Sequence, residues 1–223
     1  MADPKPRRKA VKENVPLYQI KVELLGTKPV IWRRILVRSD VNLGMLHAIV
    51  QLTMGWTNSH LHHFFVDNTR YSDPELEDGD WGFEGEEKPM NEREHAICDV
   101  VRPGHFEIKY EYDFGDSWEH ILAIERLEKE SAGFQGFALC MAGERACPPE
   151  DCGGISGVAN LLETIKHPNH AEYEETMEWL GGRYNPDAFD VAKVNKCLKK
   201  LKWEHPSIDQ LGKILAARDG YKE

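Results

Sequence analysis

The stretch FEIKYEYDFGDSWEHILAIE, residues 106–125, decides the fold because it predicts a β-hairpin in the middle of the chain. Apolar and charged residues alternate along 106–114, and the alternation resumes along 118–124. A period of two is typical of a strand that buries one face. The segment Gly-Asp-Ser at 115–117 lies between the two runs and is typical of a turn. We therefore expect two antiparallel strands that share one apolar face.

The turn end of this hairpin carries a dense group of polar side chains. The group lies within eight residues and consists of Asp113, Asp116, Glu119 and His120, next to Trp118. Carboxylates and an imidazole at the point where a strand meets solvent predict a site. The alternative is that Asp116 and Ser117 only form the turn, because Asp and Ser commonly hydrogen-bond their own backbone there.

The composition is that of a folded globular protein. The chain has 223 residues, 41% of them hydrophobic, with six Trp, seven Tyr and eight Phe. No stretch approaches the roughly 18 apolar residues of a membrane span, and no apolar segment follows the charged N-terminus. We expect a soluble cytoplasmic protein without a membrane partner. Five Cys residues in such a chain favour reduced thiols or metal ligands over a disulfide framework.

The charge is unevenly distributed. The formal net charge is -10, but residues 1–16 contribute +3, which leaves -13 for the remainder. An acidic body repels a phosphate backbone, so a nucleic-acid partner is disfavoured except through this basic tail. We expect residues 1–16 to be a disordered, solubilising terminus.

The chain opens with elements typical of an α+β domain. The β-branched runs 17–25 and 30–37 flank the turn sequence GTKP at 26–29, which predicts a first hairpin. A helix is expected over 43–54, ending before a glycine. The residues that can cap it are Ser39, Asp40 and Asn42. Strand, strand, helix is a β-grasp-like start, and we expect a mixed or antiparallel sheet with the 106–125 hairpin at its centre.

A histidine-rich strand is predicted next, over 60–66. In a strand His60 and His62 share one face and His63 lies on the other, a spacing suited to metal ligation or proton transfer. The alternative is that these histidines are hydrogen-bonded core or rim residues, since Leu and Phe surround them.

Residues 73–94 are strongly acidic, and we expect a surface loop because like charges at this density resist packing. A calcium site is not indicated, since the segment has no DxDxDG loop. Residues 95–101 are expected to return the chain to the sheet.

Three cysteines lie in a second notable segment, 140–154, which its prolines and glycines predict to be an irregular loop. Cys140, Cys147 and Cys152 can hold Zn²⁺ if the fold supplies a fourth ligand such as a histidine. The spacing lacks the CxxC knuckle of most zinc sites, so buried free thiols are the alternative.

The C-terminal part is predicted to be helical. Helices are expected over 156–166, from an Asn169–Glu172 capping box to 180, and over 191–201 after Asp187 or Asp190. Cys197 is expected in the core, and Ser207 can cap a last amphipathic segment. The expected organisation is a tail at 1–16, one domain at 17–202 and a helical extension at 203–223.

Several strings together resemble the plasmid pRiA4b ORF-3-like family over most of residues 17–202. They are YQIKV (18–22), PVIWRR (29–34), the 46–56 segment from Leu-His to Met-Gly-Trp, SHLH (59–62), YDFGDSWEH (112–120), PPEDCGG (148–154) and the 189–195 helix. The resemblance implies no established activity. Some relatives carry a transposon-passenger, resolvase-like label, but a serine recombinase needs a nucleophilic Ser with an arginine cluster and a DNA-reading helix-turn-helix, and neither is identifiable here.

We expect the strand at 60–63, the turn at 113–120 and the loop at 148–154 to converge on one polar cleft. Its candidate residues are His60, His62, Asp113, Asp116, Trp118, Glu119, His120 and Asp151. The favoured function is a binding or adapter module for a protein, peptide or small-molecule partner, because no nucleophile with its base and no phosphate loop is identifiable. The alternatives are a metal-assisted hydrolase and a zinc-stabilised structural domain. A purely structural alternative is that the loops buttress each other.

Overall fold

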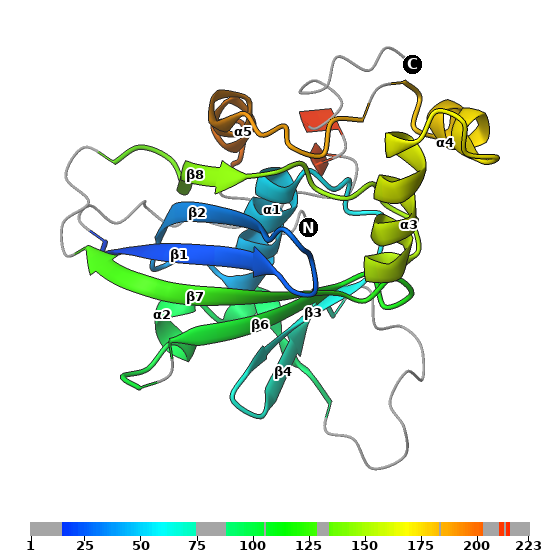
Figure 1. Cartoon of the computed structure of the whole chain (residues 1–223). Helices are drawn as coiled ribbons and strands as arrows, with labels where there is room; N and C mark the ends of the chain where they lie inside the picture. The colour runs from blue at the N-terminus through cyan, green and yellow to red at the C-terminus, as the bar shows by residue number, and fades with distance from the viewer. Residues whose placement is uncertain are drawn as a thin grey trace, which may run out of the picture.

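The computed structural model describes residues 15–74, 88–104, 106–128, 134–182, 184–202, 210–211 and 213–214. Its strands are β1 (Leu17–Leu24), β2 (Ile31–Arg38), β3 (His62–Val66), β4 (Thr69–Ser72), β5 (Met90–Asn91), β6 (Glu107–Tyr112), β7 (Trp118–Glu128) and β8 (Ala138–Glu144). They form one sheet in the order β5-β4-β3-β6-β7-β1-β2-β8 (Figure 1). The β4–β5 pair is parallel and the other pairs are antiparallel, which confirms the mixed sheet of an α+β fold.

The predicted hairpin is confirmed, and it occupies the middle of the sheet. Tyr112 pairs with Trp118 and Tyr110 pairs with His120 across β6 and β7. The other edge of β7 pairs with every residue of β1, so the hairpin joins the two halves of the sheet. Along β6, Ile108, Tyr110 and Tyr112 are buried, as the period of two predicts.

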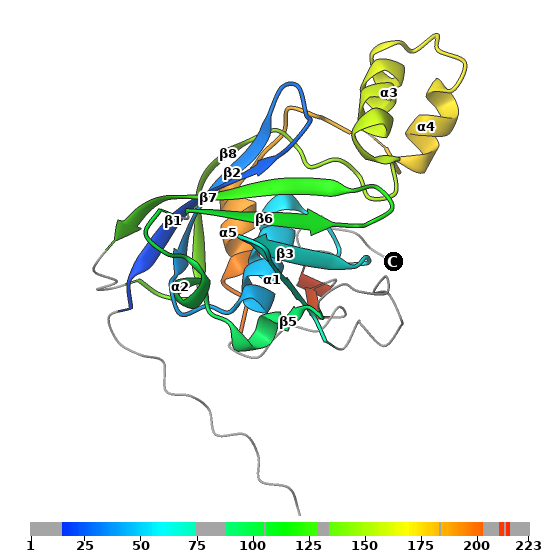
Figure 2. The same cartoon turned by 90° about the horizontal axis from the view of Figure 1, so that it is seen from below.

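The strand, strand, helix start is also confirmed. β1 pairs with β2, and α1 (Leu43–Met54) follows. The side chain of Asn42 caps α1 by accepting a hydrogen bond from Met45 N at 2.8 Å, and the helix ends at Gly55 with φ of 117°. Every residue of α1 is buried, because the sheet lies on one side of it and α5 (Val191–Leu198) on another (Figure 2).

Three expectations for connecting segments were wrong. Residues 97–100 form the short helix α2 (Ile97–Val100) instead of a strand, because Ala96 makes only an isolated bridge to Asn42. Cys140 belongs to β8, an edge strand on β2 that ends only at Glu144, so the irregular loop begins later than expected. The expected capping box at 169–172 does not form, since α4 (Tyr173–Trp179) begins after Glu172 without a side-chain cap.

The acidic segment is more structured than expected where it is described. Residues 75–87 lie outside the described residues, but 88–94 contain β5 and the 3₁₀ turn η1 (Glu92–Glu94). Glu92 is 0% exposed, although it lies in a run of acidic residues. Its burial is possible because the imidazole of His62 partners its carboxylate.

The helices of the C-terminal part lie at two places. α3 (Gly154–Lys166) and α4 form a hairpin of helices that stands off one end of the sheet (Figure 2). α5 begins after the cap Asp190 and covers β8, where the Asn195 side chain bonds both backbone groups of Cys140. Cys197 is buried in the core as expected. The basic tail up to residue 14 and Ser207 lie outside the described residues. In the described part of the chain, the helices are too short and too polar to cross a membrane.

Candidate functional site

Three segments meet at the turn end of the β6–β7 hairpin. The backbone N–H of Asp113 donates to the carbonyl oxygen of Leu61 at 2.8 Å, which holds the turn against the segment before β3. On the other side, the N–H of Gly153 donates to the carboxylate of Asp116 at 3.2 Å. The structure therefore brings together parts of the 60–63, 113–120 and 148–154 segments, at Leu61, Asp113, Asp116 and Gly153.

One histidine and two aspartates point toward one another at this junction. The Nε2 atom of His60 lies 3.6 Å from Asp113 Oδ2 and 3.2 Å from Asp151 Oδ1. All three ligand atoms lie within 4.8 Å of one another, and the described residues contain no second group of three His, Cys, Asp or Glu side chains that could hold a metal ion. The side chain of Asp113 is 9% exposed, that of His60 is 27% exposed and that of Asp151 is 72% exposed. The group thus has a buried floor and an open, solvent-facing side.

Both aspartates have left-handed backbone conformations, with φ of 60° at Asp113 and 58° at Asp151. Such conformations are unfavourable for residues other than glycine, least so for Asn and Asp. At Asp113, Oδ1 accepts hydrogen bonds from Gly115 N at 3.0 Å and Asp116 N at 3.3 Å. These bonds fix the carboxylate so that Oδ2 faces His60. Asp113 therefore forms the turn and also contributes to the site.

A hydrogen-bonded link between Tyr112 and Glu150 supports the base of the cleft. The Tyr112 hydroxyl donates to Glu150 Oε1 at 2.5 Å and accepts from Ser59 N at 3.0 Å, and Thr57 also donates to the Glu150 carboxylate. Desolvation, followed by the hydrogen bond to Glu150, raises the pKa of Tyr112 well above its usual value. Sequence reasoning missed this pair, although both residues lie in the strings that carry the family resemblance.

The other predicted site residues do not join the cleft. His62 is buried, lies 2.8 Å from Glu92 and stacks on His47 with 3.4 Å between ring centroids. Trp118 and His120 are 0% and 1% exposed and face the core, and burial lowers the pKa of His120 to about 4. Glu119 is exposed on the outer face of β7. The two-residue period of β7 explains this separation, because Trp118 and His120 share the inner face.

The three cysteines proposed as zinc ligands do not converge among the described residues, since no group of three potential ligands there includes a thiol. Cys140 is buried in β8, whereas Cys147 and Cys152 are partly buried in the loop that follows. Burial raises the pKa of Cys140 to about 11 and that of Cys152 to about 12. All five cysteines are among the described residues, and none of them forms a disulfide.

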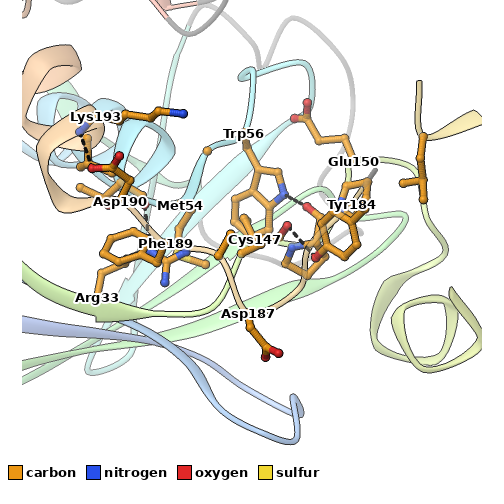
Figure 3. Close-up of a pocket in the computed structure, with 18 of the residues that line it drawn as sticks. Arg33, Met54, Trp56, Cys147, Glu150, Tyr184, Asp187, Phe189, Asp190 and Lys193 are labelled. Carbon is orange, nitrogen blue, oxygen red and sulfur yellow. Dashed lines mark hydrogen bonds between the residues drawn. The ribbon is translucent and has the colours of Figure 1, made fainter. Parts of the chain in front are cut away.

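A large cavity is lined by residues 146–150, in the loop that also carries Asp151 of the cleft (Figure 3). Its volume is about 1020 Å³, and Glu150 lines it. The Trp56 indole donates to Pro148 O at 3.1 Å, and the Tyr184 hydroxyl donates to Cys147 O at 3.1 Å, so two aromatic side chains hold the loop. The further aromatic side chains of the lining are Phe189 and Trp179.

The floor of the cavity is formed by a buried arginine. Arg33 is 0% exposed and donates four hydrogen bonds to backbone carbonyl groups. The acceptors are Thr53, Trp32, Glu144 and Arg145, at 2.8 to 2.9 Å. The Phe189 ring covers the guanidinium, with 4.0 Å between the Arg33 Cζ atom and the ring centroid. Arg33 thereby ties α1, β2 and the start of the 145–150 loop together.

Comparison with known sequences and structures identifies the family. A family model described as plasmid pRiA4b ORF-3-like protein matches residues 16–193. The chain belongs to the pRiA4b ORF-3-like family. One relative, the uncharacterized protein y4hQ of Sinorhizobium fredii (strain NBRC 101917 / NGR234), is 36% identical over 189 residues, which is 83% of this chain and 93% of the relative.

A solved structure shares the pRiA4b ORF-3-like fold described above. It is the protein of unknown function MM3350 from Methanosarcina mazei Go1, with a TM-score of 0.71 and 32% sequence identity. The match covers 80% of this chain and 97% of that chain. The names of both relatives carry no activity.

Proposed function

We propose that this pRiA4b ORF-3-like protein is a binding module that receives a peptide segment of a partner protein in the cavity beside the cleft. The observation that carries the proposal is the cavity itself, whose volume of about 1020 Å³ is at the upper end for ligand sites in proteins. Its lining combines aromatic rings and prolines with a few charged groups, as binding sites commonly do.

The lining favours a ligand that is apolar and basic. Pro148, Pro149 and the aromatic side chains of the lining other than the buried Trp56 offer apolar surfaces for prolines, aliphatic side chains or the stem of a lysine or arginine. The acidic lining residues are Glu150, Asp187 and Asp190, against Lys193 and the buried Arg33. The net charge of -10 also favours the approach of a basic partner.

A peptide selection with matched variants tests this proposal. Trp179 and Phe106 are each 51% exposed, but only Trp179 lines the cavity. We expect an immobilised library of short peptides to yield apolar sequences that contain Lys or Arg. The Trp179→Ala variant should weaken the selected peptide by about tenfold, as loss of an aromatic contact does at many interfaces, and Phe106→Ala should leave its affinity unchanged. Selection of acidic peptides, or equal losses in the two variants, would contradict the proposal.

A metal-assisted hydrolase is the second candidate, favoured by the convergence of His60, Asp113 and Asp151. It requires turnover that depends on added metal and that disappears in Asp151→Asn. Peptide binding without such turnover would favour the binding module.

A further inference from the structure

We propose that His60, Asp113 and Asp151 bind one divalent first-row transition-metal ion, of which Zn²⁺ and Mn²⁺ are the probes to use. The proposal concerns the cleft and does not rest on peptide binding in the neighbouring cavity. It also differs from the zinc site expected at the cysteines, because its ligands are one imidazole and two carboxylates.

The donor set selects the class of ion. Imidazole nitrogen suits Zn²⁺, Mn²⁺ and other first-row transition metals, and carboxylate oxygen is a ligand for the same ions. Mg²⁺ and Ca²⁺ prefer sites made only of oxygen, so His60 disfavours them. Three protein ligands leave at least one position open for water or for a bound ligand, as in sites where the metal acts on another molecule.

The distances between the ligand atoms fit a bound ion. Ligands about 2.1 Å from a metal lie about 3.4 Å apart in tetrahedral geometry and about 3.0 Å apart at adjacent octahedral positions. The two distances from His60 Nε2, 3.6 Å to Asp113 and 3.2 Å to Asp151, bracket the tetrahedral spacing. The carboxylates are the wider pair, within 4.8 Å, and Asp151 can close this gap because its side chain is 72% exposed.

Two atoms in the cluster make no hydrogen bond with the described residues, and one of them is buried. The Nε2 atom of His60 is inaccessible to solvent and makes no hydrogen bond there, although both carboxylates are near it. Asp113 is 9% exposed, and its hydrogen bonds from Gly115 and Asp116 go to Oδ1, so Oδ2 has no hydrogen-bond donor among the described residues. A buried nitrogen without a hydrogen bond is costly, and a cation shared with Asp113 Oδ2 removes that cost.

The charge around the cluster also favours a cation. Asp113, Asp116 and Asp151 lie together, and no described Lys or Arg forms an ion pair with any of them. Ion pairs from His60 Nε2 to both Asp113 and Asp151 are the rival explanation, and they leave one side chain to compensate two carboxylates. The rival predicts no dependence of stability on metal.

The test is metal binding by the full, untagged chain after removal of metal with a chelator. Calorimetric titration with Zn²⁺ and with Mn²⁺ should give one ion per chain, with weaker binding of Mg²⁺ and Ca²⁺. Saturating metal should raise the melting temperature by about 5 °C, because an ion that binds only the folded chain stabilises it. The Co²⁺ complex should show no charge-transfer band from a thiolate, which a cysteine site would produce.

Matched variants separate the site from other effects of charge. Asp151→Asn keeps a residue that tolerates a left-handed backbone, and Asp67→Asn makes the same change at an exposed residue with φ of 53° in the β3–β4 turn. We expect Asp151→Asn and His60→Gln to weaken Mn²⁺ binding by about tenfold or more, and Asp67→Asn and Cys152→Ser to leave it unchanged. Absence of binding in the wild-type chain, equal affinity in Asp151→Asn, or loss of binding only in Cys152→Ser would overturn the proposal.

Discussion

The carbonyl oxygen of Asp116 lies 2.5 Å from the position that a Cβ atom on Gly154 would occupy. The start of α3 and the β6–β7 turn therefore touch at a point where only glycine fits. Gly154 also has a φ of 66°, which an L side chain rarely adopts. We expect Gly154→Ala to lower the free energy of unfolding by about 2 to 3 kcal/mol, from backbone strain of about 1 kcal/mol plus the clash. Urea denaturation measures the change.

Gly104→Ala is the control for backbone strain alone. Gly104 has a φ of 90°, but a Cβ atom there would have nothing within 4 Å. We expect Gly104→Ala to lower the free energy of unfolding by about 1 kcal/mol. It should retain its affinity for Mn²⁺, whereas Gly154→Ala should lose affinity because the loop with Asp151 shifts. Equal losses of stability in the two variants would show that the close approach of the Asp116 carbonyl group to Gly154 does not contribute to the cost of Gly154→Ala.

Local patterns were enough to predict the framework of the cleft. The period of two along β6 and β7, the polar cap before α1 and the turn chemistry at 113–117 each act over a few residues, so the sequence displays them directly. The same period also turns Trp118 and His120 into the core. Because Trp118 and His120 are near Asp113 in the sequence, the sequence suggested that they share a site with it. In β7, however, alternate residues face opposite sides of the sheet, and these two face the core.

Long-range pairings could not be predicted in the same way. Glu92 lies in an acidic run, and only its distant partner His62 makes its burial possible. The link from Tyr112 to Glu150 spans 38 residues, and the pairing of β1 with β7 spans about 100, so no local signal encodes them. The sheet order follows from these pairings, which depend on the packing of the whole core.

The buried pair of His62 and Glu92 predicts a large loss of stability when one partner is removed. The two side chains are 2% and 0% exposed, with 2.8 Å between His62 Nε2 and Glu92 Oε2. Loss of one partner from a buried pair leaves the other without its compensating group, at a cost of about 3 to 5 kcal/mol. We expect Glu92→Ala to lose about 3 kcal/mol in chemical denaturation.

His63 and Glu111 provide the comparison. Their separation is also 2.8 Å, but their side chains are 14% and 24% exposed. Water replaces the lost partner at such a site, so we expect Glu111→Ala to cost about 1 kcal/mol or less. A cost for Glu92→Ala as small as that for Glu111→Ala would contradict the role of burial.

The buried His120 predicts that stability falls with acid. Burial lowers the pKa of His120 to about 4 from the usual 6.5, with the Trp118 and Tyr110 carbonyl groups opposing the shift and Arg33 adding to it. Between pH 6.5 and 4 the unfolded chain therefore binds a proton that the folded chain does not, and the free energy of unfolding decreases as the pH falls. The contribution is roughly 2 kcal/mol between pH 7 and pH 4.5.

The comparison of wild type with His120→Gln isolates this contribution, because the other titrating groups are common to both proteins. Chemical denaturation at pH 7 and at pH 4.5 gives the change in stability for each. We expect the change to be smaller in the variant by roughly 2 kcal/mol. Identical changes would mean that His120 is protonated in the folded protein without penalty.

We expect the protein to be destabilised when the Arg33 side chain is replaced by one of the same charge but a different shape. Its planar guanidinium donates to four carbonyl groups, at Thr53, Trp32, Glu144 and Arg145. The three donors of a lysine ammonium cannot reach all four acceptors, so Arg33→Lys leaves at least one or two buried carbonyl groups unpaired, at about 1 to 3 kcal/mol each. We expect a loss of about 3 kcal/mol by urea denaturation.

Arg34→Lys is the matched control for that change. Arg34 is the next residue of β2, but its guanidinium is 33% exposed and binds the Glu125 carboxylate at the surface. At this exposed site water can hydrogen-bond to the Glu125 oxygen that the lysine does not reach. We therefore expect Arg34→Lys to lower the free energy of unfolding by less than about 1 kcal/mol. Because Arg33 also holds the carbonyl groups where the 145–150 loop begins, only Arg33→Lys should weaken binding of a selected peptide. Equal stability of the two variants would mean that the fork of hydrogen bonds at Arg33 does not hold the cavity floor in place.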